Sequence, residues 1–277
     1  MASTALGEFL RTRRARFEPY EVGLPGAGRR RVPGLRREEL AQLAGVSFDY
    51  YARLEQGRQA TASPAVLDAM ARALRLTADE RSHLYDLAGV ADGGAGTAPA
   101  RTVERGAQRF IDVLGDTPAI LRGLFDEVIS ITRAGAFLYA DFNRMPARER
   151  YGVRWMLLEP RARELYGRGW EDAAREMIGL LRLDMGRVPG DPRAAELVTE
   201  LLEKSELFRR IWRMHHVSAY LHERKTLYHP AFGAMDFFTE LVTMHTAPGQ
   251  TLVVLIPADP ATFHAAVKTQ AGITSGP

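Results

Sequence analysis

Residues 37–56 read REELAQLAGVSFDYYARLEQ, and this stretch specifies how the N-terminal part of the chain folds. Apolar residues recur in it at helical spacing on both sides of Gly45. Small Ala41 lets two helices approach closely, and Gly45 tolerates the positive φ that a tight connection requires. Ser47 is positioned to cap the second helix. The stretch therefore predicts a helix-turn-helix, a motif whose second helix lies in the major groove of DNA.

Helical patterns continue through the rest of residues 1–90. Leu6 and Leu10 begin the first pattern, and Ser63 followed by Pro64 is a typical helix start. Residues 77–80 form a capping box, in which a hydroxyl and a carboxylate bond to each other's backbone amides. We therefore expect residues 1–90 to form a five-helix domain that contains the helix-turn-helix.

The sequence pattern changes after residue 90. Residues 91–104 are rich in Gly and Ala, which predicts a linker. Beyond them, strands are expected over 125–131, 235–244 and 251–256, the last of them central, and helices over 151–158, 170–183 and 194–203. We expect residues 105–277 to form an α+β domain with helices on one side of an antiparallel sheet. The predicted fold class of the whole chain is mainly α with this α+β part.

The composition is that of an ordinary globular protein. Hydrophobic residues make up 46% and charged residues 26%, and no uncharged apolar run is long enough to span a bilayer. The first 30 residues fit neither a secretory signal nor a membrane anchor, and the chain has no cysteine. We expect a cytoplasmic protein that does not enter a membrane.

Positive charge is concentrated near the N-terminus. Its arginines fall into two clusters, Arg11, Arg13, Arg14 and Arg16, then Arg29, Arg30, Arg31, Arg36 and Arg37. Such clusters are typical of phosphate-binding surfaces, although a solvated helix face followed by a charged loop gives the same pattern. The long insert over 17–31 either follows the DNA backbone, enters a minor groove, or is a charged loop without such a role.

Residues 32–57, VPGLRREELAQLAGVSFDYYARLEQG, resemble the actinobacterial branch of the Xre-type, phage-repressor-like family. The resemblance implies double-stranded DNA as a partner. It places Phe48, Asp49 and Arg53 at base edges, with Ser47 and Tyr50 beside them and Arg37 and Arg58 on phosphates. Arg53 would bind guanine, Asp49 a cytosine amino group and Phe48 a thymine methyl group. The alternative for Arg53 and Asp49 is a surface ion pair.

The second half resembles the MmyB-like family. The matching stretches, in that family's order and spacing, are LEPRAREL (158–165), WEDAAR (170–175), PGDP (189–192), ELFRRIW (206–212) and HPAFG (229–233). The resemblance implies a C-terminal ligand-binding domain with a PAS-like fold. Where the family has Trp-Asn near the end of an early strand, this chain has Ile131-Thr132.

A domain of this family implies a cavity between a curved sheet and helices that holds a small, fatty-acid-like molecule. The residues expected to face the cavity are Trp155, Trp212, His215, Phe237 and Phe238. Arg154 or His229 would bind an anionic head group. Simple packing in the core is the alternative for each of these side chains.

The sequence predicts a regulator and not an enzyme. It has no nucleophile elbow, phosphate loop or zinc-protease helix, and no paired carboxylates accompany its clustered histidines, so we expect neither a cofactor nor a metal. The expected function is a sequence-specific DNA-binding transcriptional regulator that acts as a homodimer and is controlled by an apolar or amphipathic ligand. The alternatives are a constitutive repressor whose C-terminal domain only mediates dimerisation, and an enzyme or small-molecule carrier.

Overall fold

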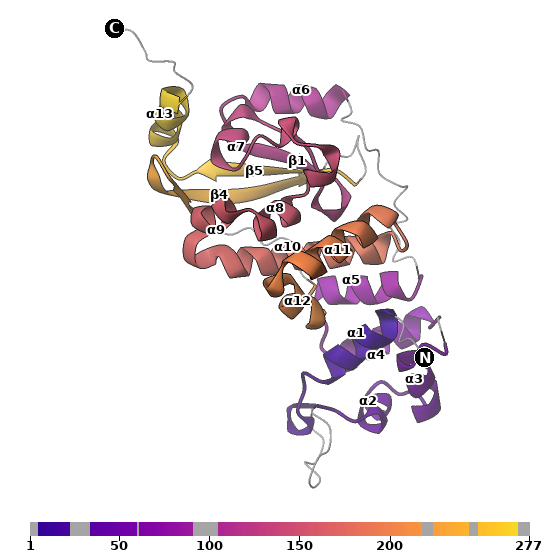
Figure 1. Ribbon diagram of the computed structural model, residues 1–277. Coiled ribbons are helices and arrows are strands. Elements are labelled where there is room, and N and C mark those ends of the chain that lie inside the picture. The colour runs from indigo at the N-terminus through magenta and orange to yellow at the C-terminus, as the bar shows by residue number, and fades with distance from the viewer. Residues whose placement is uncertain are drawn as a thin grey trace. The chain divides into compact units, whose positions relative to one another are not determined.

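The chain folds into two compact units (Figure 1). The computed structural model describes residues 5–22, 34–59, 61–90, 105–217, 224–243 and 249–270. The first unit comprises Met1–Ala95 and Trp212–Ser218, and the second comprises Gly96–Ile211 and Ala219–Pro277. The linker expected over 91–104 lies outside the described residues. The first unit is therefore discontinuous in sequence, which the sequence patterns did not predict.

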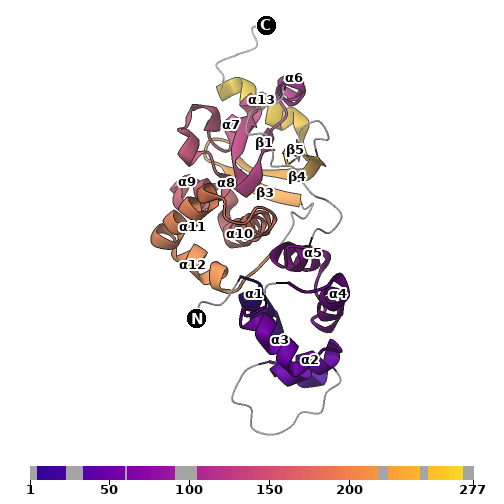
Figure 2. The same ribbon diagram turned by 90° about the vertical axis from the view of Figure 1, so that its right-hand side faces the viewer.

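The first unit is helical in its described residues, as expected (Figure 2). Its helices are α1 (Ala5–Arg14), α2 (Arg37–Leu43), α3 (Phe48–Glu55), α4 (Pro64–Ala73) and α5 (Ala78–Leu87), with a short 3₁₀ turn η1 at Pro19–Val22. Leu10, Leu40, Tyr51 and Leu67 come from four of these helices and are fully buried in one core. Burial of such side chains supplies the main driving force that holds the helices together.

Three helix starts of the first unit lie where the sequence placed them. Ser47 and Ser63 accept hydrogen bonds from backbone amides of α3 and α4, and Thr77 forms the expected capping box with Glu80 at α5. Gly45 has φ +66°, so the turn between α2 and α3 uses the left-handed conformation for which glycine was needed. These local signals fix the boundaries of the helix-turn-helix.

The second unit contains a five-stranded antiparallel sheet in the order β2-β1-β5-β4-β3. The strands are β1 (Ala119–Arg122), β2 (Val128–Ile131), β3 (Arg224–His229), β4 (Gly233–Thr243) and β5 (Thr251–Pro257). The apolar run in β5 was expected to be central, and β5 does lie in the middle of the sheet. The expected antiparallel sheet is thus confirmed.

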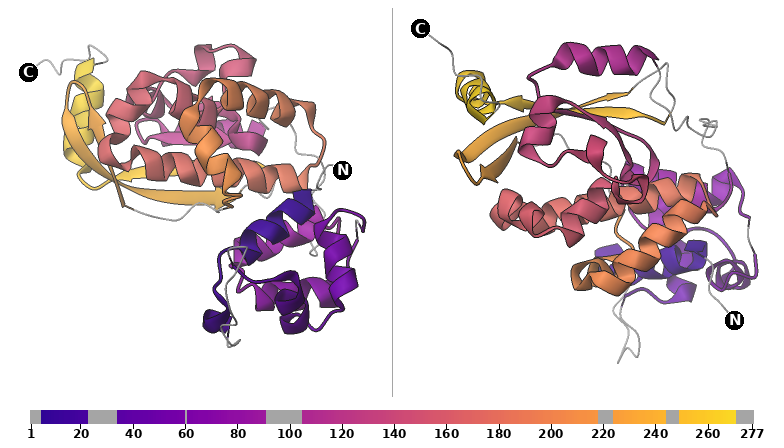
Figure 3. Two further views of the ribbon diagram at one scale, coloured as in Figure 1. Left: turned by 60° about the horizontal axis from the view of Figure 1, so that its bottom comes forward. Right: turned by 45° about the horizontal axis from the view of Figure 1, so that its top comes forward.

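Helices cover both faces of this sheet (Figure 3). They are α6 (Arg105–Leu114), α7 (Arg133–Leu138), α8 (Gly152–Leu158), α9 (Pro160–Tyr166), α10 (Trp170–Arg187), α11 (Pro192–Lys204), α12 (Glu206–Arg213) and α13 (Pro260–Gln270). Ala107 and Ile111 of α6 pack on Leu121 and Leu252, whereas the neighbouring Val253 faces α8 and α10. The sequence analysis expected helices on only one face of the sheet, and this expectation was wrong because helices pack on both faces.

The strand predictions were incomplete in two places. Phe125 was assigned to a strand, but it lies in a 3₁₀ turn, η2 (Leu124–Asp126), with left-handed φ +58°. Strands β1 and β3 were not predicted. β1 has four residues, and β3 reads RKTLYH, whose polar start suits an edge strand but gives no apolar alternation to detect.

Thr132 joins the end of β2 to α7 and to β1. Its buried hydroxyl caps α7 by accepting from the amide of Gly135 at 3.1 Å. The same oxygen accepts from the Ala119 amide at 2.9 Å and donates to the Thr117 carbonyl at 2.9 Å. Thr132 is thus a structural cap with all its hydrogen-bonding capacity used.

Replacing Thr132 by Val keeps the shape of the side chain and removes the hydroxyl. Two buried amides lose their acceptor, so we expect the free energy of unfolding to fall by about 2 to 4 kcal/mol. Thr132→Ser is the matched control, because it retains the oxygen. Urea titration of both variants checks this, and equal stabilities for Val and Ser would contradict the capping role.

Candidate functional site

The exposed face of α3 carries the residues expected to read DNA bases. Ser47, Phe48, Asp49 and Arg53 are exposed and Tyr50 is half-buried, while Tyr51, Leu54 and Glu55 on the opposite face are buried. Asp49 and Arg53 are one helical turn apart, and among the described residues no ion pair joins them. The structure therefore brings Phe48, Asp49 and Arg53 together on one accessible surface. Their base contacts stay a prediction.

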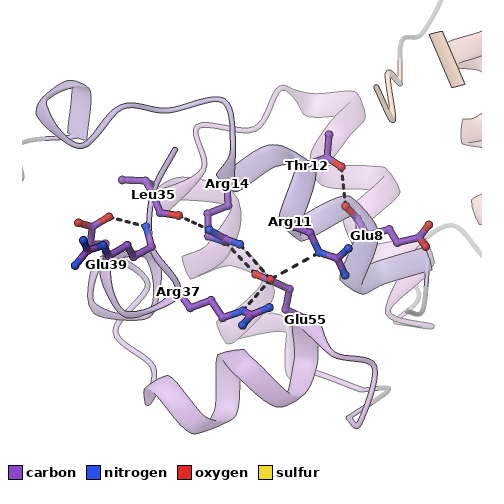
Figure 4. Close-up of polar contacts among 9 residues, drawn as sticks. Glu8, Arg11, Thr12, Arg14, Leu35, Arg37, Glu39 and Glu55 are labelled. Carbon is purple, nitrogen blue, oxygen red and sulfur yellow. Dashed lines mark hydrogen bonds and ion pairs between the residues drawn. The ribbon is translucent and has the colours of Figure 1, made fainter. Parts of the chain in front are cut away.

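A buried carboxylate lies at the end of the same helix (Figure 4). Glu55, the last residue of α3, accepts from Arg14 Nε at 3.0 Å and Nη2 at 3.1 Å, and from Arg37 Nε at 2.9 Å. Arg11 Nε lies 3.9 Å from the same carboxylate. Arg14 also donates to the carbonyl of Leu35, in the segment before α2. The cluster thus ties α3 to α1 and α2.

The charges in this cluster compensate one another. Burial raises the pKa of Glu55, but the hydrogen bonds and charges of Arg14 and Arg37 outweigh burial, so its pKa lies below the ordinary value. Glu55 is therefore ionised at neutral pH. Its carboxylate explains why arginines from different helices converge there instead of pointing into solvent.

The structure changes the interpretation of the N-terminal arginines. Arg13 and Arg14 are buried, Arg16 Nη1 lies 2.7 Å from Glu80, and Arg37 uses its Nε on Glu55. Most of the first cluster is therefore an internal ion-pair network and not a free phosphate-binding surface. Arg58 is exposed beyond the end of α3, as a phosphate contact requires. Residues 23–31 of the insert, which include Arg29, Arg30 and Arg31, lie outside the described residues.

The second unit encloses a small apolar cavity between its sheet and helices. Ile120, Val128 and Val253 line it from the strands, and Tyr139, Phe142, Trp155, Tyr166 and Met177 line it from the helical side. Its volume is about 30 Å³, about the space of one water molecule. A ligand of ordinary size therefore requires this cavity to open.

One end of the cavity is polar. Arg122 Nη1 donates to Asp126 Oδ1 at 2.6 Å, and both side chains are almost completely buried. Burial raises the pKa of Asp126, against the opposing effect of Arg122. Asp126 and the preceding Phe125 both have positive φ, a costly conformation for residues with side chains.

Asp184 of α10 holds this turn. Its Oδ2 accepts from the amide of Phe125 at 2.9 Å, and burial raises the pKa of Asp184 to about 6. Arg122 and Asp126 thus line the polar end of the cavity, and the buried carboxylate of Asp184 supports the strained turn behind them. Such a combination is more typical of a functional site than of simple core packing.

A second, open cleft of about 700 Å³ lies on the other side of α8. Tyr151 and Arg154 of this region face the cleft, whereas Gly152 and Trp155 face the apolar cavity. Arg154 donates to both oxygens of Glu200 at 3.0 Å each. Helix α8 therefore separates a polar cleft from an apolar interior.

Of the predicted ligand contacts, the structure places Trp155 at the apolar cavity and the others elsewhere. Phe237 packs on Phe263, its ring centroid 5.5 Å away, whereas Phe238 lies on the opposite face of β4 and is 46% exposed. Adjacent residues of a strand point to opposite faces of the sheet, so Phe237 and Phe238 cannot both face one cavity. His229 stacks on Phe137 with the ring centroids 4.5 Å apart.

Trp212 and His215 belong to the first unit, and this corrects their assignment to the ligand site. The chain passes from the second unit to the first between Ile211 and Trp212, within α12. Helical periodicity does not reveal such a change of unit within one helix. The sequence reasoning missed Arg122 and Asp126, because a buried ion pair leaves no periodic signal. Tyr139, Phe142 and Tyr166 lie outside every predicted helix and strand, so the sequence pattern gave no reason to place them at a cavity.

The described residues contain no helix long and apolar enough to cross a membrane. Within the same ranges, no group of three or more His, Asp or Glu side chains is arranged to hold a metal ion. His222, part of the histidine cluster considered in the sequence, lies outside the described residues.

Glu55→Gln should strongly destabilise the first unit, because Arg14 would keep a buried charge without its anion. We expect a loss of about 3 to 5 kcal/mol. The depressed pKa of Glu55 makes its contribution present above the ordinary glutamate pKa and lost as the pH falls through the folded-state value. The variant should therefore also show a weaker dependence of stability on acid pH.

Native-state hydrogen exchange of α1 and α3 amides, measured at several pH values, checks this expectation. Glu38→Gln is the matched control, because Glu38 lies on α2 and is exposed. Equal protection in the two variants would show that the cluster contributes little to the stability of α3.

Two family models match the chain. A model described as helix-turn-helix domain matches residues 5–84, and a model described as MmyB-like transcription regulator ligand binding domain matches residues 103–268. No curated protein matches the chain. The two matched ranges include α3 with its exposed face and both the cavity and the cleft of the second unit.

Proposed function

Because the chain belongs to the family of MmyB-like transcription regulators, we propose that it binds specific DNA sequences through α3 and that a small molecule in its second unit controls this binding. The observation that carries the proposal is the exposed face of α3 with Phe48, Asp49 and Arg53. A helix whose exposed residues include a cation, an acceptor and an apolar ring suits base edges of the major groove.

The electrostatics of the first unit support the same function. The buried carboxylate of Glu55 neutralises part of the positive charge behind α3, and Arg58 remains exposed at its end. Phosphate contacts from such flanking cations position a helix, while the contacts on its exposed face select the sequence. As a DNA-binding regulator, the protein would act in the cytoplasm.

Helix-turn-helix regulators commonly bind two half-sites as symmetric dimers, and we propose a homodimer here on that general ground. A constitutive repressor whose second unit only mediates dimerisation is the alternative. The buried ion pair of Arg122 with Asp126 favours ligand control, because a domain that served only for assembly would need no charges inside an apolar cavity.

We propose an apolar or amphipathic ligand, with a fatty acid as the model compound, for the cavity at Trp155. Its aromatic walls suit an acyl chain, and Arg122 at the polar end suits a carboxylate. The strand order and the helices between β2 and β3 support the PAS-like fold expected for such a domain. Because ligand pockets typically measure about 300 Å³ or more, binding must displace part of the wall, and α8 is the element that lies between cavity and cleft.

The test of DNA reading begins with selection of duplexes from a randomised pool by the full-length protein. On the enriched duplex, Arg53→Ala should weaken binding by about 1 to 3 kcal/mol, with little change on unrelated DNA. Arg58→Ala, the matched control, should weaken binding to both and lower the salt slope by about one. Failure to enrich any sequence would refute the proposed function, and equal losses on both DNAs would make Arg53 a phosphate contact.

The test of the ligand compares two substitutions on β5. Val253→Phe fills the cavity, whereas Ile256→Phe adds the same ring on the exposed face of the strand. We expect straight-chain fatty acids to raise the melting temperature of the wild type and of Ile256→Phe, since a ligand at a hundredfold excess over its Kd stabilises the folded state by about 2.7 kcal/mol. Val253→Phe should lose this shift. A shift that persists in Val253→Phe would exclude this cavity as the site.

A further inference from the structure

A short segment at the end of α12 and just beyond it completes the core of the first unit. We call the described residues of this part, 212–217, the return segment. Val217 is 5% exposed and packs in the same core as the helices α1 to α5. His215 has φ +48°, and its amide bonds to the Trp212 carbonyl at 3.2 Å, so the segment turns sharply as α12 ends. The first unit is thus not completed by its N-terminal residues alone.

Arg13 of α1 holds the return segment. Its guanidinium donates to the carbonyl of His215, lies 4.5 Å from the ring centroid of Phe9, and has its Nε 3.1 Å from Glu80. Burial lowers the pKa of Arg13 to about 10, against the opposing effect of Glu80. Arg13 therefore stays charged at neutral pH, and a buried charge needs the acceptors that Glu80 and His215 supply.

The next residue of α1 holds the recognition helix. Arg14 bonds to Glu55 at the end of α3, as described above. Consecutive residues of one helix thus bind the return segment and α3. Arg13 and Arg14 thus form a continuous chain of contacts from His215 through α1 to the end of α3.

We propose that the return segment is the connection through which the second unit controls the recognition helix. The proposal rests on the proposed DNA-binding function. The segment follows Leu207, Phe208 and Ile211, which are buried, and β3 of the second unit follows it at Arg224, so both of its ends continue into that unit. A docked segment keeps α1 and α3 in the DNA-reading arrangement, and a released segment loosens them.

The absence of cysteine from the chain permits a direct test of docking. Val217→Cys places a single thiol in the core, and Met214→Cys places one on the same segment at a residue that is 57% exposed. In the full-length protein, the thiol of the Val217→Cys variant should react with a thiol reagent at least about tenfold more slowly than the thiol of the Met214→Cys variant, since burial of a Val-sized side chain is worth about that factor. Equal rates would overturn the docked segment.

Transmission to α3 is tested without DNA by hydrogen exchange. Val217→Ser and the milder Val217→Ala should accelerate exchange of α1 and α3 amides by about tenfold or more for Ser, whereas Met214→Ser should not. Unchanged protection in β1 and β5 establishes that the second unit remains folded in each variant. Wild-type protection of α3 in both Val217 variants would overturn the proposal.

The duplex enriched in the selection experiment then links docking to DNA reading. Because coupling between two equilibria is reciprocal, the duplex should slow thiol labelling of the Val217→Cys variant further, and unrelated DNA should not. Unchanged labelling in the presence of the enriched duplex would refute control through this segment while leaving DNA binding intact. Absence of any enriched duplex would refute the DNA-binding function, and the exchange data would still decide whether the segment acts on α3.

Discussion

Three helices of the first unit meet at one buried carboxylate. A charge inside a small helical domain is unfavourable by several kcal/mol unless cations and hydrogen bonds compensate it. Arg14 from α1 and Arg37 from α2 provide this compensation for Glu55 of α3. Since one partner comes from each helix, none of the three can shift without separating charges in a medium of low dielectric. The accessible face of α3 is rigid because its buried face ends in this cluster.

The second unit uses buried charge for a different purpose. Asp184 and Arg122 stabilise a turn in which Phe125 and Asp126 both adopt the left-handed conformation. Each such residue stores about 1 to 3 kcal/mol of strain, and only specific polar contacts maintain it. Asp126 of this strained turn lines a cavity that is too small for a ligand. A strained backbone turn beside a cavity smaller than a ligand is an arrangement in which ligand binding would change the conformation of the domain.

Much of the fold could be predicted from local signals. Gly45, Ser47 and Thr77 each act within a few residues, so the sequence alone reveals the turn and the helix starts. The pairing of Arg14 with Glu55 spans 41 residues and depends on how helices pack, which periodicity does not describe. For the same reason, periodicity did not predict the buried ion pair of Arg122 with Asp126.

The candidate DNA site was more predictable than the candidate cavity for a geometric reason. The resemblance placed Phe48, Asp49 and Arg53 on the second helix of the motif, and all three lie within α3 and are exposed. A cavity collects side chains from many elements, and its prediction requires the topology. Phe237 and Phe238 show the consequence, since adjacent residues of a strand face opposite sides of the sheet.

The return of the chain to the first unit at Trp212 also constrains the order of events during synthesis. The five N-terminal helices leave the ribosome first, but Val217, which fills part of their core, is made more than a hundred residues later. At elongation rates of about 5 to 20 residues per second, this interval lasts on the order of ten seconds. The nascent first unit must persist through that time with an incomplete core and with Arg13 lacking the carbonyl of His215. The first unit is thus finished only after most of the second unit has been made, and a chain that ends before Val217 lacks part of the first unit's core.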